Sequence, residues 1–203
     1  MQAETLAVRE AIRIETVTVV YMILEAGLAL WAGIAAHSAL LAAFGLDSVI
    51  ELFSGAIVLW RLQVEAKGSD PGQVEKAEKR AAWGTIIALS LLCAYVLVTA
   101  VSGLLSHSPG ENSWLGIAVS LFAVLFMPYL ALRKRVLARR LHSLSLADDA
   151  AESITCAYMA ATVLLGLVFN ALFQWWWIED IAALGFLVWL VKETWEAFEE
   201  IRE

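Results

Sequence analysis

Residues 38–55 read Ser38-Ala-Leu-Leu-Ala-Ala-Phe-Gly-Leu-Asp47-Ser-Val-Ile-Glu51-Leu-Phe-Ser-Gly55, an apolar run that contains two carboxylates. With its flanks, this run is long enough to cross a bilayer, which takes about 20 apolar residues in a helix. Asp47 and Glu51 are four residues apart, so they lie on one face of a helix, one turn apart. A carboxylate that faced lipid would be strongly unfavourable. We therefore expect the pair to face the interior of a helix bundle and to meet a cation there.

The composition of the whole chain is that of a polytopic membrane protein. Of the 203 residues, 61% are hydrophobic and 17% are charged, and the mean hydropathy is +0.72. Soluble domains are about 45–50% apolar and about 25% charged. The formal net charge of -7 and the lack of a basic stripe argue against a nucleic-acid partner. We expect a single all-α transmembrane domain over residues 1–203, with no soluble domain and no signal peptide.

Six hydrophobic segments of about twenty residues or more predict a bundle of six transmembrane helices. Their approximate ranges are 12–35, 38–62, 81–105, 114–132, 141–172 and 176–198. Only Ala36 and His37 separate the first two segments, which predicts a tight helical hairpin. Residues 73–80 are charged and are expected to form a helical lead-in to the third segment.

The Lys and Arg residues predict how the bundle is oriented. Six spans place all 14 of them on one side of the membrane, before the first span, in the second and fourth connections, and near the C-terminus. The positive-inside rule makes that side cytoplasmic, with both termini there. We expect a multi-pass protein of the cell membrane, and the charge segregation suits a bacterial inner membrane.

Several acids lie inside the predicted spans. Those near the middle of the membrane, or straddling it, come from the first, second and fifth spans: Glu25, Asp47, Glu51 and Glu152. Asp148 and Asp149 lie toward the cytoplasmic end of the fifth span. No Lys or Arg is predicted at the same depth, so we expect no ion pair to neutralise these acids. Two solutions remain, which are protonation of the acids or a cation that they share.

This pattern favours a metal/proton antiporter over two other classes of protein. Clustered carboxylates in a low dielectric retain protons when empty, and a divalent metal displaces those protons because its ligands bind deprotonated. A membrane metalloenzyme is less favoured because no His-rich pair or base motif accompanies the acids, so we expect no enzyme. A non-transporting metal-binding or regulatory membrane protein of the same fold is the remaining alternative. Taken singly, Glu25 could be a hydrogen-bonded structural group and Cys156 a small buried residue.

The sequence resembles the membrane domain of the cation diffusion facilitator family of metal/proton antiporters, over essentially the whole chain. Ser38 followed by Asp47 and Glu51 resembles the second-helix motif of the family, a Ser followed by two ligands four residues apart. Residues 147–156, Ala-Asp-Asp-Ala-Ala-Glu-Ser-Ile-Thr-Cys, resemble the fifth-helix motif, and residues 175–184 resemble the opening of the sixth helix. The resemblance implies cation efflux, with divalent metal ions and protons as the exchanged substrates, and a homodimer.

The sequence departs from the family pattern at the fifth helix, where two registers are open. In one register Asp148 and Glu152 are the metal ligands. In the other, Asp149 precedes the pair formed by Glu152 and Cys156, and membrane depth favours this second register. The resemblance also implies a short form of the family, because the histidine-rich loop and the C-terminal cytoplasmic domain are missing. The dimer contacts of such a form are expected within the membrane.

The metal stays open among zinc, manganese, iron and cobalt. A set of carboxylates suits Mn²⁺ or Fe²⁺, whereas a thiolate from Cys156 would favour Zn²⁺ or Cd²⁺. Glu25 is a candidate ligand in place of the missing histidine, on the basis of its depth alone. The expected site is therefore Asp47, Glu51 and Glu152, completed by Cys156 or by one of the upstream acids of the fifth helix.

Overall fold

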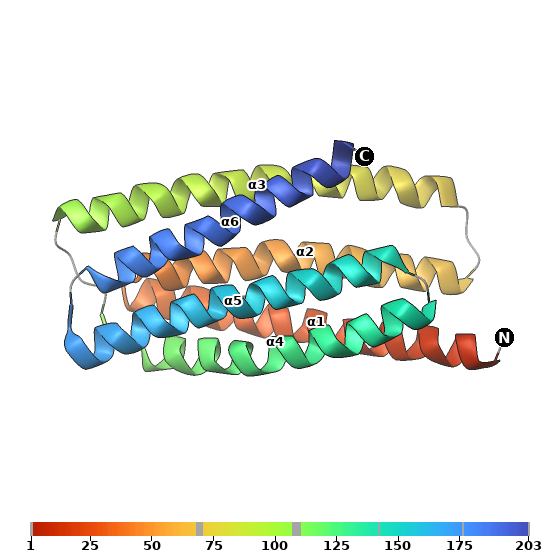
Figure 1. The fold of residues 1–203 in the computed structure, drawn as a ribbon, viewed down its shortest axis with the longest axis horizontal. Helices are drawn as coiled ribbons and strands as arrows, with labels where there is room; N and C mark the ends of the chain where they lie inside the picture. Colours follow the sequence, from red (N-terminus) through yellow and green to blue (C-terminus); the bar gives the residue numbers. More distant parts are fainter. Residues whose placement is uncertain (1, 68–70, 107–110, 142, 176, 203) are drawn as a thin grey trace.

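The computed structural model describes residues 2–67, 71–106, 111–141, 143–175 and 177–202, and over these residues it consists of six α-helices with no strand (Figure 1). The helices are α1 (Gln2–Ala35), α2 (Ala39–Lys67), α3 (Pro71–Ser106), α4 (Trp114–Leu141), α5 (Leu144–Phe173) and α6 (Ile178–Arg202). The all-α fold predicted from the sequence is confirmed.

Five of the six helices are long and apolar enough to cross a bilayer, with candidate spans Leu6–Ala35, Ala39–Trp60, Ile86–Ser106, Trp114–Leu141 and Asp149–Phe173. Helix α6 is not among the five. Its apolar middle is short because Glu179 and Asp180 precede it and Lys192 and Glu193 follow it. The helices make the chain a multi-pass membrane protein, and α6 has the largest share of charged residues among them.

Several helices extend further than their predicted hydrophobic segments, and α1 begins at Gln2 rather than near residue 12 while α2 ends at Lys67 rather than near residue 62. Helix α3 begins at Pro71, so the charged lead-in predicted for residues 73–80 is part of it. Helix α4 continues beyond Leu132 through the basic segment to Leu141. Arg, Lys, Leu and Ala are strong helix formers, and Leu137 and Ala138 are buried, so this segment has both the propensity and the packing to stay helical. The basic residues of this segment are therefore carried on a helix rather than on a loop.

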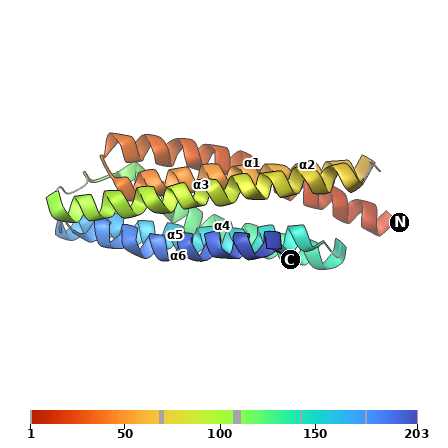
Figure 2. The ribbon, with the colours of Figure 1, turned by 90° about the horizontal axis from the view of Figure 1, so that it is seen from above.

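The helices form a four-helix group and a pair. Helix α1 packs on α2 and α4, α4 packs on α5, and α2 packs on α5. Helices α3 and α6 pack on each other and contact the group through α2 and α5. Figure 1 shows α3 along one side of the group, with α6 crossing toward it, and Figure 2 shows all six helices running along the same long axis.

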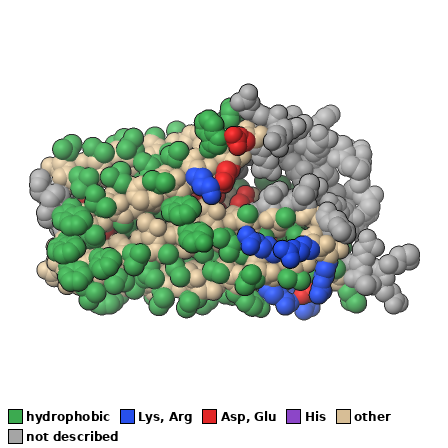
Figure 3. Space-filling view, viewed as in Figure 1, with side chains coloured by type: hydrophobic (Ala, Val, Ile, Leu, Met, Phe, Trp, Pro, Cys, Tyr) green, Lys and Arg blue, Asp and Glu red, His purple; other side chains and the backbone are tan. Residues whose placement is uncertain are grey.

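The connections therefore gather at two ends of the bundle. We call the end where α4 finishes with Arg139 and Arg140 the basic end, and the end with the α1–α2 turn at His37 the His37 end. On the face drawn in Figure 3, the Lys and Arg side chains gather toward the basic end, and hydrophobic side chains cover the His37 half. The alternating helices place every basic position of the sequence toward the basic end, as predicted.

Helices α1 and α2 touch at backbone distance near the His37 end. A Cβ atom at Gly33 would lie 2.6 Å from the backbone nitrogen of Ala42, and one at Gly45 would lie 2.7 Å from that of Leu30. Small residues at helix contacts allow this close approach within membranes. These two contacts fix the register of the hairpin, with Gly33 opposite Ala42 and Leu30 opposite Gly45.

Candidate metal site

The two acids of α2 lie on its buried face. Leu40 and Phe44 precede Asp47 and Glu51 at spacings of three and four residues, and all four side chains are buried. The four carboxylate oxygens of Asp47 and Glu51 have no hydrogen-bond partner among the described residues. A buried carboxylate without a partner is unfavourable unless it is protonated or a cation approaches it. The interior position predicted for the pair is confirmed.

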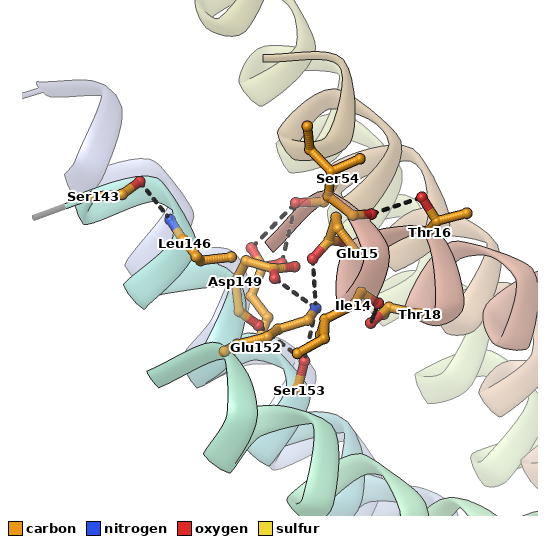
Figure 4. A network of polar contacts seen from close by, with 12 residues as sticks. Ile14, Glu15, Thr16, Thr18, Ser54, Ser143, Leu146, Asp149, Glu152 and Ser153 are labelled. Atoms are coloured by element: carbon orange, nitrogen blue, oxygen red, sulfur yellow. Dashed lines mark hydrogen bonds and ion pairs between the residues drawn. The ribbon is translucent and has the colours of Figure 1, made fainter. Parts of the chain in front are cut away.

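Helix α5 brings Glu152 and Cys156 to the same region. The Ser54 hydroxyl of α2 donates to both carboxylate oxygens of Glu152, at 3.1 and 3.4 Å (Figure 4). The Cys156 thiol is fully buried and faces the carboxylate of Glu51. The ligands expected from the two helices are therefore neighbours across the α2–α5 contact.

Helix α1 adds Glu25 to this interior. Glu25 is buried, and neither of its carboxylate oxygens has a hydrogen-bond partner in the described part of the chain. It lies within electrostatic range of Asp47, Glu51 and Cys156. The structure thus places Glu25 beside the other candidate ligands, and its role as a ligand stays a prediction.

These side chains do not form a finished coordination shell. Within the described ranges, no three His, Cys, Asp or Glu side chains are arranged so that they could hold a metal ion. What the interior offers is a set of buried, unpaired carboxylates and one thiol. A cation that entered would have to draw these groups together.

Asp149 belongs to a different group of charges. The Lys134 ammonium lies 2.5 Å from Asp149 Oδ2 and 3.2 Å from Glu15 Oε2, and it donates to Ser153 Oγ at 3.4 Å (Figure 4). The side chains of Lys134 and Glu15 are fully buried. We call Glu15, Lys134 and Asp149 the charge triad. It joins α1, α4 and α5.

The charge triad corrects one expectation. From the sequence, Lys134 is predicted to lie in a connection outside the membrane, and no ion pair is expected for the acids inside it. That expectation is wrong for Asp149, because α4 stays helical through its basic segment and turns Lys134 into the bundle. The side chain of Asp148 lies outside the described residues, so its predicted role as a ligand stays untested.

A second polar cluster joins three helices at the His37 end. Ser38 Oγ donates to Glu179 Oε2 at 2.5 Å, and Asn170 Nδ2 donates to Glu179 Oε1 at 2.5 Å. The Ser38 hydroxyl also accepts from the backbone N–H of Leu41 at 3.3 Å, which caps the start of α2. We call Ser38, Asn170 and Glu179 the outer tie. It holds the start of α2, the end of α5 and the start of α6 together.

Four buried or partly buried charged residues are not predicted from the sequence, and these are Glu15, Lys134, Glu179 and Glu193. Each of them continues the row of buried residues on its helix at a spacing of three or four. Lys134, for example, lies between the buried residues Leu130 and Leu137. That spacing was the signal that could have revealed them. Hydropathy averaged over a window does not detect this spacing, because a charged residue near the end of a span is assigned to the connection that follows or precedes the span.

The fold and this interior define a polytopic helical membrane protein whose core holds unpaired acids from several helices. The family model for the cation efflux transmembrane domain matches residues 16–202. The chain therefore belongs to the cation efflux, or cation diffusion facilitator, family and is a cation transporter. Members of this family are transporters and not enzymes. A comparison with curated protein sequences gave no match.

Proposed function

We propose that this transporter exports a divalent transition metal from the cytoplasm in exchange for protons, through a site formed by Asp47, Glu51, Glu152 and Cys156. The observation that carries the proposal is the environment of Asp47. Its side chain is fully buried, and neither of its oxygens has a hydrogen-bond partner in the described part of the chain. Among the described residues, Lys134 is the buried basic side chain, and it already forms ion pairs with Glu15 and Asp149. A proton or an incoming cation is then left to neutralise Asp47.

Exchange follows from what each state of the site requires. An empty site keeps its carboxyl groups protonated because burial opposes their ionisation. A metal ion binds only the deprotonated groups, so each carboxyl that becomes a ligand releases its proton. Two carboxylates that bind one M²⁺ ion release two protons, which balances the charge. Metal and protons therefore exclude one another, and this exclusion couples their movements in opposite directions.

The composition of the site bears on which metal is carried. Carboxylate oxygens suit Mn²⁺ and Fe²⁺, whereas a thiolate favours Zn²⁺. Because the Cys156 thiol faces Glu51, the contact that joins α2 to α5 holds one soft and one hard ligand. We expect Zn²⁺ and Co²⁺ to be preferred to Mn²⁺ for this reason.

The orientation of the bundle follows from the charge segregation, and the outward direction that we propose follows from membership of the cation efflux family. The positive-inside rule assigns the basic end to the cytoplasm, and we expect the host membrane to be a bacterial inner membrane, which this charge segregation suits. Metal would reach Glu152 from the basic end, pass to Asp47 and leave at the His37 end, as one helix group rocks against the other. Asp149 has its own cation in Lys134, so it does not belong to the set of metal ligands that we propose. We expect the working unit to be a homodimer.

A flux assay in proteoliposomes tests the proposal. Purified protein is reconstituted with a pH gradient, and Zn²⁺, Co²⁺, Fe²⁺ and Mn²⁺ are supplied in turn while metal and pH are followed with fluorescent indicators. We expect metal-driven proton movement in the wild type and its loss in Asp47→Asn and Glu152→Gln. The exposed acid Glu196 gives the matched control, and Glu196→Gln should keep the wild-type rate. Proton movement that persists unchanged in Asp47→Asn would overturn the proposed site, and binding without flux would favour a non-transporting protein.

A further inference from the structure

Helix α6 presents one acid on its buried face in the basic half of the bundle. Ala183, Phe186 and Leu190 are buried, and Glu193 continues this row at the same spacing of three or four residues. Glu193 Oε2 is buried and has no hydrogen-bond partner among the described residues. Its neighbour Lys192 lies on the exposed face, 3.4 Å from Glu196. The carboxylate of Glu193 lies on the inner face of α6, the helix with the largest share of charged residues, and its position there needs a physical reason.

The outer tie allows the depths of side chains on three helices to be compared. Because Ser38 and Asn170 both donate hydrogen bonds to Glu179, the three residues lie at one level of the bundle. Glu51 comes 13 residues after Ser38, and Glu193 comes 14 residues after Glu179. At about 1.5 Å of rise per residue, Glu51 and Glu193 lie about 20 and 21 Å along their helices from the outer tie.

Helix α5 and helix α1 reach the same depth with two more candidate ligands. Cys156 comes 14 residues before Asn170, which also places it about 21 Å from the outer tie. In the register that pairs Gly33 with Ala42 and Leu30 with Gly45, Glu25 lies opposite Ile50, next to Glu51. Four helices therefore carry one candidate ligand each at a similar distance along the helix from the outer tie.

Electrostatic contacts agree with this placement. Glu193 lies within electrostatic range of Glu51, Asp47 and Glu152. Helix α6 packs directly on α2 and on α5, which supply those three acids. Asp47 itself is fully buried, and neither of its oxygens has a hydrogen-bond partner among the described residues, so a proton or a cation must neutralise it independently of how many acids surround it.

We propose that Glu193 is a further metal ligand of the transport site, supplied by α6 to a layer that it shares with Glu25, Glu51 and Cys156. This inference rests on the proposed function. Glu193 would add to the set of Asp47, Glu51, Glu152 and Cys156, from which a tetrahedral Zn²⁺ or Co²⁺ ion takes four ligands at most, while the groups left unbound keep their protons. The metal would then connect the four-helix group to the α3–α6 pair. Whether the site holds a metal would therefore depend on the position of α6.

Binding of Co²⁺ to the purified full chain in detergent tests the inference, with Co²⁺ as the probe because its visible absorption reports the number and type of its ligands. Loss of outer partners of metal ligands costs about 10–100-fold in affinity, so loss of a direct ligand should cost at least about tenfold. We expect Glu193→Gln to weaken Co²⁺ binding by at least this factor and to change the absorption spectrum. Glu196→Gln, three residues further on, should bind within about twofold of the wild type.

Two further variants keep the outcomes distinct. Glu193→Asp retains a carboxylate and should bind Co²⁺ with most of the affinity that Glu193→Gln loses. If the longer side chain had only a structural role, this shorter acid would not restore the affinity. Unchanged affinity and spectrum in Glu193→Gln, in a protein whose Glu51→Gln variant has lost Co²⁺ binding, would overturn the inference and leave the proposed function standing. A wild type that binds no Co²⁺ and moves no metal would overturn the proposed function, and the inference with it. Size-exclusion chromatography and thermal melting without metal establish that Glu193→Gln is folded.

Discussion

Replacing Lys134 by methionine removes the only cation of the charge triad while keeping the length and most of the volume of its side chain. Glu15 and Asp149 would then be left facing each other in a buried position with no positive partner. Removing one member of a buried ion pair typically costs about 3–5 kcal/mol, because the remaining charge is uncompensated. We therefore expect Lys134→Met to lower the free energy of unfolding by about 3–5 kcal/mol.

The adjacent residue provides the matched control. Arg133 is also ion-paired, with its guanidinium 2.6 Å from Glu10 Oε1, but the two side chains are 51% and 38% exposed. Exposed ion pairs contribute about 0–1 kcal/mol, so Arg133→Met should cost no more than that. Two neighbouring substitutions on one helix should thus differ by about 3 kcal/mol, although both break an ion pair of similar length.

The assay is unfolding by SDS in mixed detergent micelles, followed by circular dichroism, with the free energy of unfolding extrapolated to zero SDS. The triple variant Lys134→Met, Glu15→Gln and Asp149→Asn should recover most of the lost stability, since a buried ionic cluster can often be replaced by uncharged groups at little cost. Equal stabilities of Lys134→Met and Arg133→Met would refute the reasoning. So would a triple variant that is no more stable than Lys134→Met.

Two more substitutions test the packing near the His37 end by the same unfolding assay. Gly33→Ala should cost about 1–3 kcal/mol because its Cβ would meet the backbone of α2. Gly27, whose added Cβ meets nothing within 4 Å, is the control, and Gly27→Ala should be neutral or stabilising by up to about 1 kcal/mol; equal losses at the two glycines would contradict the close approach of α1 and α2. Glu179→Ala should cost about 2–3 kcal/mol because it leaves the donors of Ser38 and Asn170 without this acceptor, and Glu179→Gln should cost less. If both changes at Glu179 are neutral, the outer tie does not stabilise the fold.

Much of the fold could be predicted because a bilayer imposes strong constraints on a sequence. Hydrophobic segments of sufficient length, together with one-sided Lys and Arg, predict six alternating helices. The spacing of Asp47 and Glu51 was enough to place both on the inner face of α2, because lipid excludes carboxylates. These inferences use local sequence and the membrane alone, and the structure confirms them.

The charge triad could not be predicted in the same way. Residues 15, 134 and 149 meet only when α1, α4 and α5 have been packed in a particular arrangement. Hydropathy also ended the fourth span before Lys134, whereas the helix continues for two more turns and buries that side chain. Glu193 was overlooked for a similar reason, since it follows Lys192 and lies in a charged stretch of α6. Which fifth-helix acids and thiol bind the metal stays a prediction.

The outer tie gives α6 a pivot. The first turn of α6 is held to α2 and α5 through Glu179. The other half of α6 packs on α3. There, Cys93 Sγ lies 3.7 Å from Thr194 Oγ1, and the ring centroids of Trp83 and Phe198 are 6.3 Å apart. Glu193 lies about 21 Å along the helix from that pivot, so a swing of about 5° would move it by about 2 Å. That displacement is about the length of one metal–oxygen bond, near 2.0–2.2 Å for zinc. A swing of this size would be enough to make or break the bond to the metal that we propose for Glu193.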